Sequence, residues 1–122
     1  GTAITKFFDT EIARTGLSER EARDAGIDYS AGMIRSTTRA GYYPGASEMW
    51  VKLLAERGSG RLLGGQIVGG PGAGKRIDTV ATAVAAGMTA GELEYLDLSY
   101  APPFSPVWDP VQIAARKAAA ST

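Results

Sequence analysis

The chain contains neither cysteine nor histidine among its 122 residues. It therefore has no thiolate nucleophile, no side chain that ordinarily changes charge near neutral pH, and neither of the commonest zinc ligands. A Ser-His-Asp or Cys-His catalytic site cannot be assembled within this chain. Any catalysis must use tyrosine, lysine, aspartate, glutamate or a group that another molecule supplies.

The sequence also lacks net charge and long apolar runs. Thirteen Lys plus Arg balance thirteen Asp plus Glu, so no long-range field attracts nucleic acid or an anionic membrane. No apolar run approaches the roughly 18 residues that span a bilayer, and the N-terminus lacks a secretory pattern. We expect no nucleic-acid or membrane partner and a cytoplasmic location. The length suits one hydrophobic core, so residues 1–122 are expected to form a single domain.

The first half of the chain is rich in β-branched and aromatic residues, which favour strands. We expect four strands, at residues 4–15, 28–39, 49–56 and 62–68. Gly-containing connections join the last three, which should form an antiparallel meander. Within the second strand, apolar residues recur at Tyr29, Ala31 and Met33, and this alternation predicts that they face the core.

Four helices are expected. Ser18 and Thr89 begin capping boxes, for helices at residues 18–25 and from Thr89 to about Leu96. Asp109 caps a helix that starts at Pro110 and ends near Ala119, with Gln112 completing the box. The fourth helix, ended by Gly87, has apolar residues at spacings of three and four: Ile77, Val80, Ala81, Val84, Ala85 and Met88. Together these elements predict an α+β domain, an antiparallel sheet of four to five strands with helices on one face.

A glycine-rich stretch from Gly69 to Lys75 matches the G-x-x-x-x-G-K pattern of a phosphate-binding loop. However, Arg76 occupies the position where that loop needs a serine or threonine hydroxyl for magnesium. Pro71 also removes one of the backbone N–H donors that would bind phosphate. We therefore favour an ordinary strand-to-helix turn, and a small anion- or nucleotide-binding protein is the less favoured alternative.

Residues 100–106 include three prolines, so they form neither a helix nor a central strand. Pro103-x-x-Pro106 matches a minimal polyproline ligand, which leaves a non-catalytic peptide or protein interaction module as an alternative function. Tyr42, Tyr43 and Tyr100 lie close to glycine or proline in loops, where functional residues concentrate. Such a tyrosine serves either as an acid or hydrogen-bond donor or as an amphipathic anchor, and residue type alone favours the anchor.

Three separated motifs occur in this chain in the order known from one family. They are Tyr-Tyr-Pro-Gly-Ala at residues 42–46, Lys-Arg-Ile-Asp through Ala-Gly-Met-Thr at residues 75–89, and Tyr-Ala-Pro-Pro-Phe-Ser at residues 100–105. The chain resembles the C-terminal dimerisation domain of FAD-dependent pyridine nucleotide-disulfide oxidoreductases, specifically coenzyme A-disulfide reductases and related NADH oxidases. The likeness extends from about Thr2 to Arg116.

This resemblance implies that the chain is one domain of a longer enzyme, whose upstream domains bind FAD and NAD(P)H and carry a redox-active cysteine. The chain itself would bind no cofactor, would be inactive alone, and would pair with a second copy and with those upstream domains. Tyr42 and Tyr100 match two tyrosines that the family places near the partner subunit's cysteine, as acids or hydrogen-bond donors to the leaving thiolate. Tyr100, Phe104 and Trp108 are expected at the dimer interface.

The resemblance leaves the substrate of the parent enzyme open between coenzyme A disulfide, a persulfide and oxygen. The glutathione reductase branch is disfavoured, because it uses a C-terminal His-Pro pair and this chain has no histidine.

Overall fold

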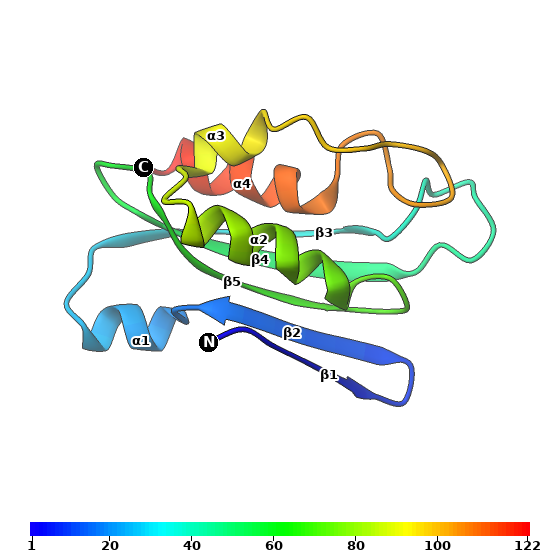
Figure 1. Ribbon diagram of the computed structural model, residues 1–122, viewed down its shortest axis with the longest axis horizontal. Helices are drawn as coiled ribbons and strands as arrows, with labels where there is room; N and C mark the ends of the chain where they lie inside the picture. The colour runs from blue at the N-terminus through cyan, green and yellow to red at the C-terminus, as the bar shows by residue number, and fades with distance from the viewer.

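The computed structural model describes residues 1–122 and has an α+β fold, as predicted. Its sheet has five antiparallel strands in the order β1-β2-β5-β4-β3, and helices α2, α3 and α4 lie on one face of it (Figure 1). The strands are β1 (Ala3–Phe7), β2 (Thr10–Gly16), β3 (Tyr29–Thr37), β4 (Glu48–Glu56) and β5 (Leu62–Gly69). The helices are α1 (Glu19–Asp24), the 3-10 turn η1 (Gly74–Arg76), α2 (Ile77–Ala85), α3 (Ala90–Glu94) and α4 (Pro110–Ala120).

The hydrophobic core lies between the sheet and the helices. Alternate residues of β4, among them Met49, Val51 and Leu53, are completely buried, because successive side chains of a strand point to opposite faces. Helix α4 packs on β3 and β4, and α2 packs on β5 and β2. The predicted meander of β3, β4 and β5 is confirmed by the pairing of β4 with both neighbours.

Strand β3 presents the opposite face from the one predicted. Ser30 and Gly32 are buried, whereas Met33 is 49% exposed. A Cβ at Gly32 would lie 2.4 Å from the backbone nitrogen of Ala118 in α4, and Ser30 Oγ donates to the Ala118 carbonyl at 3.0 Å. The small side chains of β3 face the core because α4 packs directly on its backbone, so the apolar alternation was misleading here.

The single strand predicted at residues 4–15 is instead a hairpin of β1 and β2. Phe7 pairs with Thr10, so Phe8 and Asp9 form a two-residue turn. Phe8 takes a left-handed conformation with φ 54°, which two-residue hairpins require and which glycine, asparagine and aspartate usually supply. The turn was missed because a phenylalanine occupies that position within an otherwise strand-like run.

The helix caps at Ser18 and Thr89 form the predicted capping boxes, and Gly87 ends α2 with φ 71°. Asp109 caps α4 by accepting the Val111 N–H at 2.9 Å, but Gln112 does not complete the box. It is buried, and its Nε2 donates to the carbonyls of Leu93, Glu94 and Leu96. In α2 the buried alanine is Ala83, and the predicted Ala85 is exposed.

The sheet face opposite the main helices carries an exposed apolar row. Ile12, Val68 and Trp50 lie side by side on neighbouring strands in the register of the sheet, and each is more than a third exposed. This row lies on the strands and does not include the loops that carry Tyr42 and Tyr100. No helix is both long and apolar enough to cross a membrane.

The approach of α4 to β3 gives a stability prediction. Gly32→Ala should lower the free energy of unfolding by about 1–3 kcal/mol, because the added methyl would overlap the α4 backbone. Gly41→Ala is the matched control, since no atom lies within 4 Å of its Cβ position. Urea unfolding of both variants measures the difference, and equal stabilities would contradict the close packing of α4 on β3.

Candidate functional site

Two connections far apart in the sequence lie side by side at one end of the molecule (Figure 1). The tyrosine loop, residues 38–47, joins β3 to β4, and the proline segment, residues 95–109, joins α3 to α4. The backbone N–H of Ala40 donates to the carbonyl of Pro102 at 3.3 Å, which ties the two directly. Each carries one of the predicted tyrosines.

The backbone bond from Ala40 to Pro102 joins positions two residues from Tyr42 and two residues from Tyr100, so the two tyrosines lie near each other. Side-chain hydrogen bonding with Tyr42 raises the pKa of Tyr100 above its ordinary value, and desolvation adds to the increase. Both residues are nevertheless exposed, Tyr42 at 78% and Tyr100 at 45%. A raised pKa leaves the Tyr100 phenol neutral, as tyrosine is at physiological pH, and makes it a weaker acid. Its hydroxyl can therefore act as a hydrogen-bond donor.

The Arg76 side chain donates hydrogen bonds to both the tyrosine loop and the proline segment. Its Nη2 donates to the Thr38 carbonyl at 2.6 Å and to the Phe104 carbonyl at 2.9 Å. Its Nε pairs with Asp109 Oδ2 at 3.1 Å, with side chains that are only 12% and 15% exposed, and Nη1 donates to the Gly72 carbonyl at 2.9 Å. One guanidinium therefore bonds to the tyrosine loop and to the proline segment.

Tyr43 has a different environment from Tyr42. It is half-buried, and the Arg39 guanidinium lies over its ring at 5.9 Å while donating to the Pro44 carbonyl at 3.0 Å. These contacts brace the turn of the loop, so Tyr43 acts as an anchor and Tyr42 is left projecting.

The predicted interface aromatics surround the same end of the molecule. Phe104 is 76% and Trp108 is 47% exposed, and Arg116 lies over the Trp108 ring at 5.0 Å while pairing with Glu94 at 3.1 Å. Three neighbouring apolar side chains are exposed as well: Tyr95, Leu96 and Val107. Exposed apolar patches of this kind mark sites of association.

The glycine-rich loop does not have the geometry of a nucleotide site. It follows a strand of an antiparallel sheet, and the Gly74 N–H donates to the carboxylate of Glu11 at 2.8 Å. A carboxylate in that position repels phosphate, and Lys75 is paired with Asp78 at 2.5 Å. The residues of this loop therefore do not fit the phosphates of a nucleotide cofactor. Nowhere do three or more acidic side chains gather as metal ligands.

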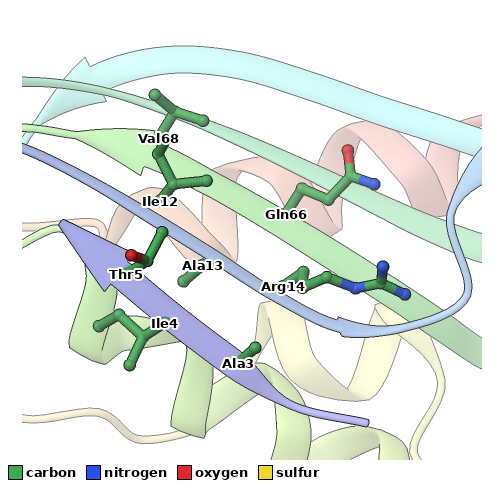
Figure 2. Close-up of a pocket in the computed structure, with 8 residues that line it drawn as sticks. All are labelled: Ala3, Ile4, Thr5, Ile12, Ala13, Arg14, Gln66 and Val68. Atoms are coloured by element: carbon green, nitrogen blue, oxygen red, sulfur yellow. The ribbon is translucent and has the colours of Figure 1, made fainter. Parts of the chain in front are cut away.

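The most apolar cavity lies elsewhere, at the β1 edge of the sheet, with a volume of about 370 Å³. Figure 2 shows that its side chains come from β1, β2 and β5. The lining residues are Ala3, Ile4, Thr5, Ile12, Ala13, Arg14, Gln66 and Val68. Arg14, its only charged group, is paired with Glu21 at 3.0 Å, so the cavity holds no unpaired reactive group.

Sequence reasoning missed the role of Arg76 in the site. The residue was considered as a departure from the phosphate-loop pattern and as part of a family motif, without a structural role. Its partners are mainly backbone carbonyls, which leave no mark in a sequence. The Asp109 cap was the one available signal, because an N-cap carboxylate has a second oxygen free to pair with a cation.

The chain is similar in sequence to known proteins. Residues 2–110 match the family described as pyridine nucleotide-disulphide oxidoreductase, dimerisation domain. The chain is 48% identical over 116 residues to the NAD(P)H coenzyme A polysulfide/persulfide reductase of Pyrococcus horikoshii, covering 95% of this chain and 26% of that protein. It is 34% identical over 118 residues to the coenzyme A disulfide reductase of Staphylococcus epidermidis, covering 97% and 26% respectively.

The fold agrees with a solved structure. Reduced CoADR-RHD of Bacillus anthracis superimposes with a TM-score of 0.93 at 40% identity, covering 99% of this chain and 22% of that one. The resemblance and the dimerisation-domain fold expected from the sequence are thus confirmed. The chain spans about a quarter of the length of the relatives that it matches.

The contact between the tyrosines gives a second prediction. Tyr42→Phe should lower the pKa of Tyr100, because the hydroxyl that chiefly raises it is removed. In the unmodified chain, the stabilisation linked to Tyr100 should be complete below the unfolded-state pKa, near 10, and lost as pH rises through the higher folded-state value. Carbon-13 NMR of ring-labelled tyrosine measures the titration residue by residue. Tyr43→Phe is the control, and an unchanged Tyr100 titration in Tyr42→Phe would contradict the contact.

Proposed function

This chain belongs to the dimerisation-domain family of the pyridine nucleotide-disulphide oxidoreductases, and from that premise we propose that it pairs two subunits and completes each partner's active site. Residues 1–122 act as one domain, which follows FAD- and NAD(P)H-binding domains of the same cytoplasmic protein. Those cofactors supply the reducing electrons. The isolated chain binds neither and is inactive.

The observation that carries this proposal is the convergence of Tyr42 and Tyr100 at an exposed apolar surface. The chain has neither a cysteine nor a histidine with which these two phenols could react. Donors of this kind need an acceptor from another molecule. Phe104 and Trp108, which are exposed on the same proline segment as Tyr100, supply apolar surface on which that molecule can dock.

The proposed chemistry uses the hydroxyl groups of Tyr42 and Tyr100 as hydrogen-bond donors to a leaving sulfur. When a thiolate attacks a disulfide, one sulfur–sulfur bond breaks and the leaving sulfur departs as a thiolate. A neutral phenol can donate a hydrogen bond to that sulfur and so stabilise the departing thiolate. We propose that Tyr42 and Tyr100 perform this role in trans, next to the redox-active cysteine of the partner subunit.

The substrate that we propose is a coenzyme A disulfide or persulfide. The Pyrococcus horikoshii relative is a coenzyme A polysulfide/persulfide reductase and the Staphylococcus epidermidis relative is a coenzyme A disulfide reductase. Both reactions release a thiolate or hydrosulfide, so one pair of phenol donors serves either.

The pairing part of the proposal predicts self-association. Sedimentation equilibrium at micromolar concentrations should detect a dimer of the 122-residue chain, because an interface of ordinary size forms stable pairs. Trp108→Ala should weaken the dimer, and Trp50→Ala, a comparably exposed tryptophan on the opposite sheet face, should leave it unchanged. A strict monomer, or equal effects of the two variants, would contradict this interface and favour an interaction module with another partner.

The trans arrangement predicts complementation between inactive subunits of the full-length enzyme. One subunit carries Tyr42→Phe and Tyr100→Phe, and the other lacks the redox-active cysteine. A purified heterodimer should recover about half of the activity of the unmodified dimer, since one of its two symmetric sites is intact. Each variant homodimer is the control and should be nearly inactive. A heterodimer no more active than these would mean that the tyrosines act within their own subunit or not at all.

A further inference from the structure

We infer that Arg76 is a positioning residue, which sets the relative placement of Tyr42 and Tyr100 by bonding the tyrosine loop and the proline segment to one rigid point. The inference deepens the proposed function and rests on it only for the catalytic consequence. The placement of Tyr42 near Tyr100 is internal to this chain and can be measured without the upstream domains.

The base of Arg76 is fixed in the body of the domain. Arg76 ends η1 and directly precedes Ile77, the first residue of α2, which is 1% exposed in the core. Val80, one turn further along α2, is completely buried. A guanidinium that extends from this point is therefore tied to the core, whereas the two segments that it contacts are irregular and have no strand or helix ladder of their own.

Arg76 contacts residues that are close in sequence to both tyrosines. Thr38, whose carbonyl it binds, begins the tyrosine loop four residues before Tyr42. Phe104, whose carbonyl the same nitrogen binds, lies four residues after Tyr100, and Asp109 ends the proline segment. The direct bond from Ala40 to Pro102, at 3.3 Å, is long beside these contacts. The guanidinium therefore makes the larger share of the polar connections between the two segments.

The geometry requires an arginine. The guanidinium presents five N–H donors in a planar fork, whereas a lysine ammonium is a compact charge on a flexible stem. Arg76 uses all three nitrogens at once, toward carbonyls on three separate segments and a carboxylate. A lysine would retain the charge beside Asp109 but could not hold Thr38 and Phe104 together. Since the donors of Arg76 are already engaged and its side chain is 12% exposed, it does not itself bind substrate.

The test measures the placement of the tyrosines through its effect on the pKa of Tyr100. In the 122-residue chain, Arg76→Lys should shift the pKa of Tyr100 downward to the value measured in Tyr42→Phe. The first change separates the two hydroxyls, and the second removes one of them. Adding Arg76→Lys to Tyr42→Phe should then produce no further shift. Ring-labelled carbon-13 tyrosine NMR supplies the titrations, with Tyr95 as an internal reference. An unchanged Tyr100 pKa in folded Arg76→Lys would overturn the inference.

Arg57→Lys is the matched control. Arg57 also donates to two backbone carbonyls, those of Tyr29 and Ser121 at 3.0 Å, and pairs with Asp28 at 3.1 Å, but it contacts neither tyrosine-bearing segment. This variant should leave the Tyr100 titration unchanged, and a shift as large as that of Arg76→Lys would also overturn the inference.

A second variant tests the inference in case Arg76→Lys does not fold. Asp109→Asn keeps an oxygen that can cap α4, since asparagine is as good an N-cap as aspartate, but removes the charge that holds Arg76. It should shift the Tyr100 pKa in the same direction as Arg76→Lys. If Arg76→Lys unfolds by circular dichroism, the Asp109→Asn titration decides the matter, and no shift there overturns the inference.

The full-length enzyme separates this inference from the proposed function. Arg76→Lys should lower kcat by the same factor as Tyr42→Phe, and Arg57→Lys should leave kcat unchanged. If Tyr42→Phe has no effect on turnover while Arg76→Lys still shifts the Tyr100 pKa, the proposed function fails and the positioning role stands. If Tyr42→Phe lowers turnover but Arg76→Lys changes neither turnover nor the pKa, the positioning role fails and the proposed function stands.

Discussion

The ion pair between Arg76 and Asp109 determines how the irregular end of this domain is arranged. The two side chains are mostly buried, and removing one partner of a buried pair typically costs about 3–5 kcal/mol, because the other charge is left uncompensated. Here the loss would also leave the carbonyls of Thr38 and Phe104 without their donor. A single side chain thus compensates a buried carboxylate and satisfies backbone acceptors from two segments that have no regular ladder.

The pair also connects the functional end of the molecule to its core. Asp109 uses one carboxylate oxygen to cap α4 at Val111 and the other to receive Arg76. Helix α4 is held in turn by its close approach to β3, where Gly32 leaves room for the Ala118 backbone. The position of the proline segment therefore depends on how α4 packs, and the position of the tyrosine loop depends on the same guanidinium.

A domain arranged in this way exposes the hydroxyl groups of Tyr42 and Tyr100 at its surface. Tyr42 and Tyr100 are exposed, seven ion pairs engage about half of the charged side chains, and the net charge is zero. Association must then rely mainly on apolar contact, for which the exposed aromatics of the proline segment are suited. Exposed apolar side chains and a zero net charge are physically consistent with the dimerisation-domain family to which the chain belongs.

The sequence by itself determined the features that depend on neighbouring residues. The capping boxes at Ser18 and Thr89, the stop at Gly87 and the meander of β3 to β5 all follow from local hydrogen bonding, glycine conformation and alternation. Tyr42 and Tyr100 were predicted as site residues from the resemblance, because residue type alone favoured an anchor. Only the tertiary structure decided which face of β3 is buried, because α4 excludes bulky side chains there. It alone brought Tyr42 to Tyr100, because that contact depends on Arg76 bonding to backbone carbonyls, which every residue possesses and no sequence distinguishes.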